Sequence, residues 1–141
     1  MRDLPIGYFL KSINDRLKTR ADNQLKSRNL TMSQSRVLGF LHSKNGQATQ
    51  KEIGDHLQVA HPTVVGIVAR LERNGFVTCC IDPTDKRSKI VSLTKHAEII
   101  GEEMDSLIED SEARMLYGLS QEDVKNLKKY LSTIYDNLEN M

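Results

Sequence analysis

The sequence predicts a mainly α-helical protein with one small β-hairpin, an α+β fold with few strands. Three observations lead to this prediction. Apolar residues recur at intervals of three or four over most of the chain, which is the period of a helix. Capping boxes, in which two side chains three positions apart bond to each other's backbone, precede two of these stretches. One pair of short segments, 76–81 and 89–93, is instead typical of strands.

A long amphipathic helix is expected over about residues 5–27. Its apolar stripe consists of Ile6, Leu10, Ile13 and Leu17, with Phe9 beside it. A second helix begins after the capping box Thr31–Gln34. It ends near Asn45 and Gly46, because these residues tolerate the left-handed backbone that terminates helices.

Two shorter helices follow and are joined by a tight turn of about four residues. The first begins after the capping box Thr49–Glu52. The second carries Pro62 in its first turn, where the missing N–H costs nothing, and ends at Gly75. Its predicted buried stripe is Val64, Ile67, Val68 and Leu71. This order of elements is a helix-turn-helix pattern.

The two predicted strands come directly after the helix-turn-helix, with a charged turn between them. Thr94 is then expected to cap a helix over about residues 95–117, and Ser120 to cap the last helix. The last helix has apolar residues at steps of three and four, namely Val124, Leu127, Leu131, Ile134 and Leu138. Such spacing is the seam of a coiled coil.

The first and last helices carry more apolar surface than a monomer of 141 residues can easily bury. We therefore infer a homodimer in which these helical arms bury roughly 2,000 Å² or more. The whole chain, residues 1–141, is interpreted as a single domain. Within it, residues 1–30 form an N-terminal dimerisation helix, residues 31–94 the helix-turn-helix with its hairpin, and residues 95–141 the C-terminal dimerisation helices.

The composition is that of an ordinary globular protein, and no apolar run approaches the roughly 18 residues needed to cross a membrane. The N-terminus lacks the apolar segment of a signal peptide, so we expect a cytoplasmic protein. Charge is uneven, because residues 1–94 contain fifteen basic and eight acidic residues whereas residues 95–141 contain five and eleven. This asymmetry suggests a polyanion partner for the basic part, although charge scattered over solvated faces is the simpler alternative.

The polar face of the second helix of the helix-turn-helix is the predicted DNA-facing surface. Its residues are His61, Pro62, Thr63, Gly66, Arg70 and Arg73. Residues at the start of such a helix meet base edges in the major groove, and Thr63 offers a hydroxyl and a methyl group for this. Arg70 and Arg73 are better placed for phosphates. The alternative is that the two helices form a helical hairpin that packs within the protein and does not bind DNA.

A hairpin that directly follows a helix-turn-helix is a wing, so the predicted fold is a winged helix-turn-helix flanked by N- and C-terminal dimerisation helices. Arg87 lies at the wing tip, and a narrow minor groove attracts an inserted arginine. We expect Asp85 to hold the guanidinium by a charge-assisted bond and to aim it, while Lys86 and Lys89 contact phosphates. An isolated hairpin of this kind would be read as a solvated turn, but its place after the helix-turn-helix favours a wing.

The chain resembles the MarR family of bacterial transcription regulators, named for multiple antibiotic resistance. The resemblance rests on "ATQKEIGDHLQVAHPTVVGIVARLERNGFV" and "DPTDKRSKIVSLT", and the helical arms also match in length and placement. It implies a dimer that binds a pseudo-palindromic operator, with Asp85 and Arg87 as the wing pair. One departure is Gly66, where many members have a basic residue; another is His61-Pro62-Thr63 in place of a start rich in Ser and Thr.

The resemblance also implies release from DNA by a small phenolic or lipophilic effector, bound between the arms and the winged part. The candidate lining residues are Phe9, Ile13, Phe40 and His42, for which an ordinary core role is the alternative. Thiol oxidation and zinc are other triggers in the family. Neither is favoured here, because Cys79 and Cys80 lie together on a strand and the four histidines are scattered.

The sequence contains no Gly-rich phosphate loop, no Gly-x-Ser-x-Gly elbow and no metal-ligand cluster, so we predict no enzyme, cofactor or metal. The acidic residues in "EIIGEEMDSLIED" are interpreted as the solvent-exposed face of a helix. The prediction is a homodimeric, sequence-specific DNA-binding regulator, a repressor relieved by a small ligand. The alternatives are an activator of the same family and a protein-interaction dimer that does not bind DNA.

Overall fold

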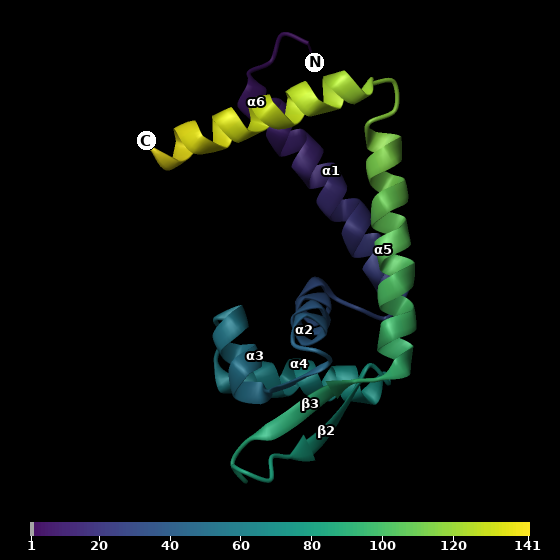
Figure 1. Ribbon diagram of the computed structural model, residues 1–141, viewed down its shortest axis with the longest axis vertical. Helices are drawn as coiled ribbons and strands as arrows, with labels where there is room; N and C mark the ends of the chain where they lie inside the picture. Colours follow the sequence, from purple (N-terminus) through teal and green to yellow (C-terminus); the bar gives the residue numbers. More distant parts are fainter. Residues whose placement is uncertain (1) are drawn as a thin grey trace. The chain divides into compact units, whose positions relative to one another are not determined.

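The computed structural model describes residues 2–141 and confirms a mainly helical fold with one small antiparallel sheet (Figure 1). In chain order the elements are α1 (Ile6–Lys26), α2 (Met32–Ser43), β1 (Gln47–Thr49), α3 (Gln50–Leu57), α4 (His61–Arg73), β2 (Val77–Ile81), β3 (Lys89–Leu93), α5 (Lys95–Met115) and α6 (Gln121–Glu139). The chain divides into two compact units, one ending at Ile100 and the other comprising Gly101–Met141. No helix in the described part is long and apolar enough to cross a membrane.

The sheet has three strands in the order β1-β3-β2, so the prediction of a two-stranded hairpin was incomplete. β3 lies in the centre and pairs antiparallel with both neighbours, with Val91 opposite Ala48 on one side and Cys79 on the other. Val91 is fully buried. β1 escaped prediction because its three residues are too few to show an alternating pattern.

The core of the first unit lies between the sheet and helices α2, α3 and α4. α4 contributes Val64, Val68 and Leu71 from its predicted stripe, each no more than 2% exposed. Ile67, the fourth residue of that stripe, is only half-buried. In the described residues the other fully buried large side chains are Val37, Leu41, Ile53, Phe76, Val77 and Val91. Because this core holds α4 by one face, the opposite face remains available to solvent.

The predicted helix boundaries are largely confirmed by the backbone hydrogen bonds. Both predicted capping boxes form, since the Thr31 and Thr49 hydroxyls each accept a backbone N–H three residues later. The turn between α3 and α4 is short, and Gln58 adopts the left-handed conformation there at φ 56°. Gly54 faces this turn, because a Cβ atom at that position would lie 3.2 Å from the Val64 Cγ2 atom. The two helices therefore pack closely, as a helix-turn-helix requires.

Thr94 joins the start of α5 to the end of α4. Its hydroxyl donates to the Gly75 carbonyl at 2.6 Å and accepts the Ala97 N–H at 3.2 Å. We expect Thr94→Val, which keeps the shape but removes both bonds, to lower the free energy of unfolding by about 1–2 kcal/mol. Urea denaturation at fixed protein concentration measures this.

The matched control for that substitution is Thr133→Val in α6. The Thr133 hydroxyl bonds only to the Lys129 carbonyl one turn earlier and is exposed, so a change below about 0.5 kcal/mol is expected. Equal changes in the two variants would contradict the role given to Thr94.

Candidate nucleic-acid interface

The polar face of α4 is solvent-exposed over its whole length. His61, Pro62, Thr63, Arg70 and Arg73 are all exposed, and Gly66 is half-buried. A Cβ atom at Gly66 would meet nothing within 4 Å, so packing inside this chain does not demand a glycine there. The structure thus places the six predicted residues on one helix, and five of them are exposed.

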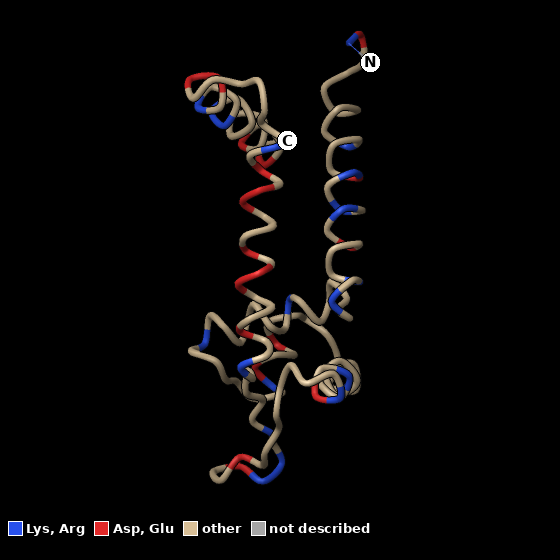
Figure 2. Tube along the Cα trace, turned by 90° about the vertical axis from the view of Figure 1, so that its right-hand side faces the viewer, with Lys and Arg blue, Asp and Glu red and all other residues tan. Residues whose placement is uncertain are grey.

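The wing is the turn between β2 and β3, residues 82–88, and it is folded by its own hydrogen bonds. The Asp82 carboxylate accepts the Thr84 backbone N–H at 2.9 Å and the Thr84 hydroxyl at 2.8 Å. These two bonds, the backbone one first, lower the pKa of Asp82 from its usual value. The backbone of Asp82 also donates to the Ser88 carbonyl at 3.0 Å, which closes the turn. Figure 2 shows acidic and basic residues together at this tip.

Asp85 has a different local role from the one predicted. Its carboxylate accepts the backbone N–H of Arg87 at 3.0 Å, and no ion pair between Asp85 and the guanidinium occurs in the described residues. The expectation that Asp85 holds the guanidinium was therefore wrong for this structure, since a carboxylate two residues earlier is closer to the backbone than to the end of the long side chain. Asp85 shapes the turn, and the Arg87 side chain extends into solvent from it.

The start of α3, the start of α4 and the wing together line one hollow of about 340 Å³. Its lining residues are Thr49, Gln50, Lys51, His61, Asp82, Asp85, Arg87 and Ser88. The hollow brings the predicted residues His61, Asp85 and Arg87 together. Gln50 and Lys51 were missed by the sequence analysis, although the capping box at Thr49 already marked a helix start, where backbone N–H groups are unpaired within the helix.

A family model for the MarR family matches residues 28–88, which contain α2, the helix-turn-helix and the wing. The predicted resemblance to the MarR family is confirmed over these residues. The match covers the elements that build the hollow and the exposed face of α4.

Solved structures of MepR from Staphylococcus aureus extend this likeness to nearly the full length of the chain. A structure of MepR, described as a transcription regulator of the multidrug efflux pump MepA, is 28% identical with a TM-score of 0.84, covering 96% of this chain and 99% of that one. A MepR substitution mutant has the same identity and coverage with a TM-score of 0.86. A MepR–DNA complex is 29% identical with a TM-score of 0.78, covering 94% and 98%.

The two cysteines of this chain differ in environment. Cys80 is exposed, whereas Cys79 is half-buried and its backbone N–H donates to the Glu72 carboxylate at 3.0 Å. Burial and then the neighbouring Glu72 raise the pKa of the Cys79 thiol to about 11. No group of three or more His, Cys, Asp or Glu residues within the described chain could hold a metal ion.

We expect Cys79 to alkylate far more slowly than Cys80. A rise in pKa from 9.0 to about 11 lowers the thiolate fraction at pH 8 by roughly a hundredfold, and only the thiolate reacts. Mass spectrometry of Cys79→Ser and Cys80→Ser treated with iodoacetamide measures each remaining thiol. Equal alkylation rates in the folded variants would contradict this expectation.

The raised pKa of Cys79 also predicts a dependence of stability on pH. Because the folded state retains the Cys79 proton more strongly than the unfolded chain, the free energy of unfolding should fall as pH rises from about 9 to 11.

The four effector candidates are not gathered into either of the hollows that the structure describes. Phe40 is 9% exposed, and its ring stacks on His56 of α3 with centroids 4.3 Å apart. It therefore serves as core, which was the stated alternative. Ile13 and His42 are exposed and Phe9 is half-buried. Their part in effector binding stays a prediction.

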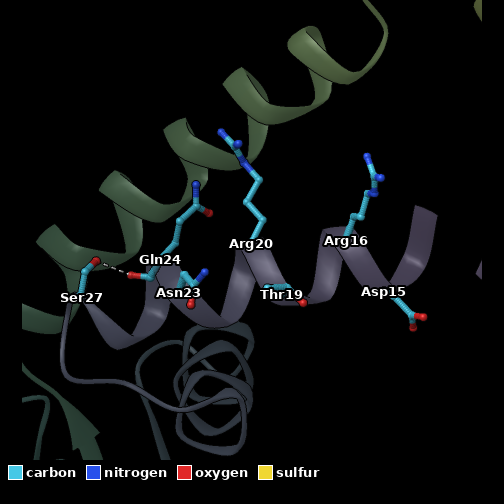
Figure 3. Close-up of a pocket in the computed structure, with 7 residues that line it drawn as sticks. All are labelled: Asp15, Arg16, Thr19, Arg20, Asn23, Gln24 and Ser27. Carbon is cyan, nitrogen blue, oxygen red and sulfur yellow. Dashed lines mark hydrogen bonds between the residues drawn. The ribbon is translucent and has the colours of Figure 1, made fainter. Parts of the chain in front are cut away.

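The other hollow runs along α1 and is lined by polar side chains. They are Asp15, Arg16, Thr19, Arg20, Asn23, Gln24 and Ser27. Figure 3 shows Arg16, Arg20 and Gln24 extending from the same side of the helix, with Asp15 pointing away, and the Ser27 hydroxyl donating to the Gln24 carbonyl at 2.8 Å.

Proposed function

We propose that this chain is a sequence-specific, DNA-binding transcription regulator. The observation that carries the proposal is that the start of α4 and the wing tip line the same hollow, through His61 on one side and Arg87 on the other. A helix face and a wing that are adjacent can engage one duplex at the same time. The solved MepR–DNA complex, 29% identical to this chain, supports the assignment.

In this proposal α4 lies in the major groove and the wing reaches the adjacent minor groove. His61, Pro62 and Thr63 at the start of α4 meet base edges, and the exposed arginines further along, Arg70 and Arg73, contact phosphates. Arg87 enters the minor groove, where the concentrated negative potential favours a guanidinium. Lys86 and Lys89, both exposed, add phosphate contacts.

We further propose that the chain acts as a homodimer on a pseudo-palindromic operator. The apolar stripe of α1 is left exposed, with Ile6 at 62% and Ile13 at 47%. In α6 the residues of the predicted seam, Leu127, Leu131 and Leu138, are 37%, 40% and 63% exposed. A second copy of the chain can bury both apolar stripes, because their heptad spacing suits helix–helix packing.

Regulation is proposed to be repression in the cytoplasm that a small phenolic or lipophilic effector relieves. Two recognition helices must lie about 34–36 Å apart to reach successive major grooves. A ligand that rotates each winged part slightly would disturb this spacing and lower the affinity for DNA. The alternative is that the protein binds DNA through the same contacts but activates transcription.

Fluorescence anisotropy with the DNA upstream of the chain's own gene tests the proposal. We expect binding at least roughly 10³-fold tighter than to a scrambled duplex, with affinity falling steeply as salt rises. Absence of binding to either duplex at low salt would overturn the proposal and leave the protein-interaction dimer as the function.

A further inference from the structure

Glu72 connects the end of α4 to the strand that leads into the wing. It lies in the last turn of α4, and its carboxylate accepts the backbone N–H of Cys79 in β2 at 3.0 Å. Within residues 2–141 no other pair of residues joins α4 to β2 or β3 through a side-chain hydrogen bond. This contact therefore ties a helix that faces solvent with its polar side to the base of the hairpin.

Local effects within α4 do not favour a glutamate at this position. The C-terminal end of a helix carries the negative end of the helix dipole, which suits a cation better than a carboxylate. Arg70 and Arg73 follow that rule, whereas Glu72 between them does not. The Glu72 side chain is also exposed, so the core does not need it for packing. What the structure shows this carboxylate doing is bonding to β2.

The N–H group that Glu72 bonds belongs to the free edge of the sheet. β2 is an edge strand, because the strand order is β1-β3-β2. Alternate N–H groups of an antiparallel edge strand point away from the neighbouring strand, and that of Cys79 does so, since it reaches Glu72. Beyond Cys79 the strand leaves the core, with Cys80 exposed and Ile81 61% exposed. Glu72 thus holds the hairpin near the point where it begins to project.

A bond at this point controls the position of the wing tip. At about 3.3 Å per strand residue the tip lies roughly 15 Å beyond Cys79, so a tilt of about 10° there would move it by roughly 3 Å. A displacement of that size equals the length of a hydrogen bond. It would separate Arg87 from a DNA group that it contacts while α4 stays in the major groove.

We propose that Glu72 is a positioning residue, which fixes the angle between the wing and α4 through its bond to the Cys79 backbone. Arg87 and the start of α4 then reach one duplex together. The inference rests on the proposed DNA-binding function and adds to it a residue that touches no DNA. Its effect on binding passes through Arg87.

Glu72→Ala and Glu72→Gln in the full chain test this role, each made with and without Arg87→Ala. We expect Glu72→Ala to weaken binding to the upstream duplex about threefold to tenfold when Arg87 is present, the effect of one lost hydrogen bond. In the Arg87→Ala protein the same substitution should change affinity by less than about twofold, because the wing then carries no guanidinium to position.

Glu72→Gln is the matched control, because it also removes the charge but keeps an oxygen that can accept the Cys79 N–H. It should bind DNA within about twofold of wild type. Loss of a negative charge near DNA would by itself strengthen binding, so the loss expected for Glu72→Ala has the opposite sign from a charge effect. Circular dichroism verifies that every variant is folded.

Hydrogen exchange followed by NMR tests the bond without DNA. In Glu72→Ala the Cys79 amide loses its acceptor and should exchange faster than in wild type. The Cys80 amide, which points toward β3, should keep its wild-type rate. An unchanged Cys79 rate would show that the bond does not form in solution and would overturn the inference.

The remaining outcomes separate the inference from the function on which it rests. If Glu72→Ala loses affinity equally with and without Arg87, its effect does not pass through the wing and the positioning role is refuted. Wild-type affinity in the folded Glu72→Ala protein also refutes it, and in both cases the DNA-binding function stands. If wild type binds no duplex, the function itself fails and the inference falls with it.

Discussion

Arg87→Ala is expected to weaken DNA binding by roughly 1–3 kcal/mol, a loss of about 5-fold to 150-fold, without changing the fold. The Arg87 side chain is exposed and makes no ion pair within the described chain, so nothing in the free protein depends on it. The turn that carries it is held by backbone bonds to Asp82 and Asp85, which alanine at position 87 leaves in place. Anisotropy titrations of wild type and variant on the upstream duplex measure the loss.

Arg114→Ala is the matched control for that experiment. Arg114 is an exposed arginine of α5 that pairs with Asp110 at 3.1 Å on its own helix. Removing such a surface pair is expected to change stability by less than about 1 kcal/mol and to leave DNA affinity unchanged. Wild-type affinity in a folded Arg87→Ala protein would refute the wing as a minor-groove contact.

Replacement of Leu127 and Leu131 by glutamate should abolish the proposed homodimer. The two side chains are four residues apart on one face of α6 and are 37% and 40% exposed, so a partner is needed to cover them. Two carboxylates on that stripe would have to lose their hydration in the dimer, which costs several kcal/mol for each charge. Sedimentation velocity should show monomers or aggregates in place of a dimer.

The control for that pair is Lys129→Glu with Thr133→Glu, which have the same spacing on another face of α6. Both positions are exposed and lie outside the apolar stripe, so the dimer should persist. A stable dimer in the Leu127→Glu, Leu131→Glu protein would show that α6 does not form the interface. The interface would then have to be sought on α1.

The sequence by itself determined the order of the elements and most of their boundaries. Helical periodicity and capping are local properties, so the Thr31 and Thr49 capping boxes and the ends at Gly46 and Gly75 could be predicted from a few neighbouring residues. The exposed face of α4 followed in the same way, because a helix that buries Val64 and Leu71 must turn its opposite side outward. The MarR-family resemblance could likewise be read from the sequence alone, because the motifs that carry it are contiguous stretches.

The tertiary structure decided what depends on residues distant in the chain. β1 is a strand only because β3, more than forty residues later, pairs with it. Phe40 became a core residue through its stacking on His56, and Asp85 bonds to backbone where an ion pair was expected. The hollow that joins Gln50 to Arg87 exists only once the sheet places the wing beside the start of α3. Periodicity describes which way a residue faces on its own element, whereas the partner it meets depends on how the elements pack.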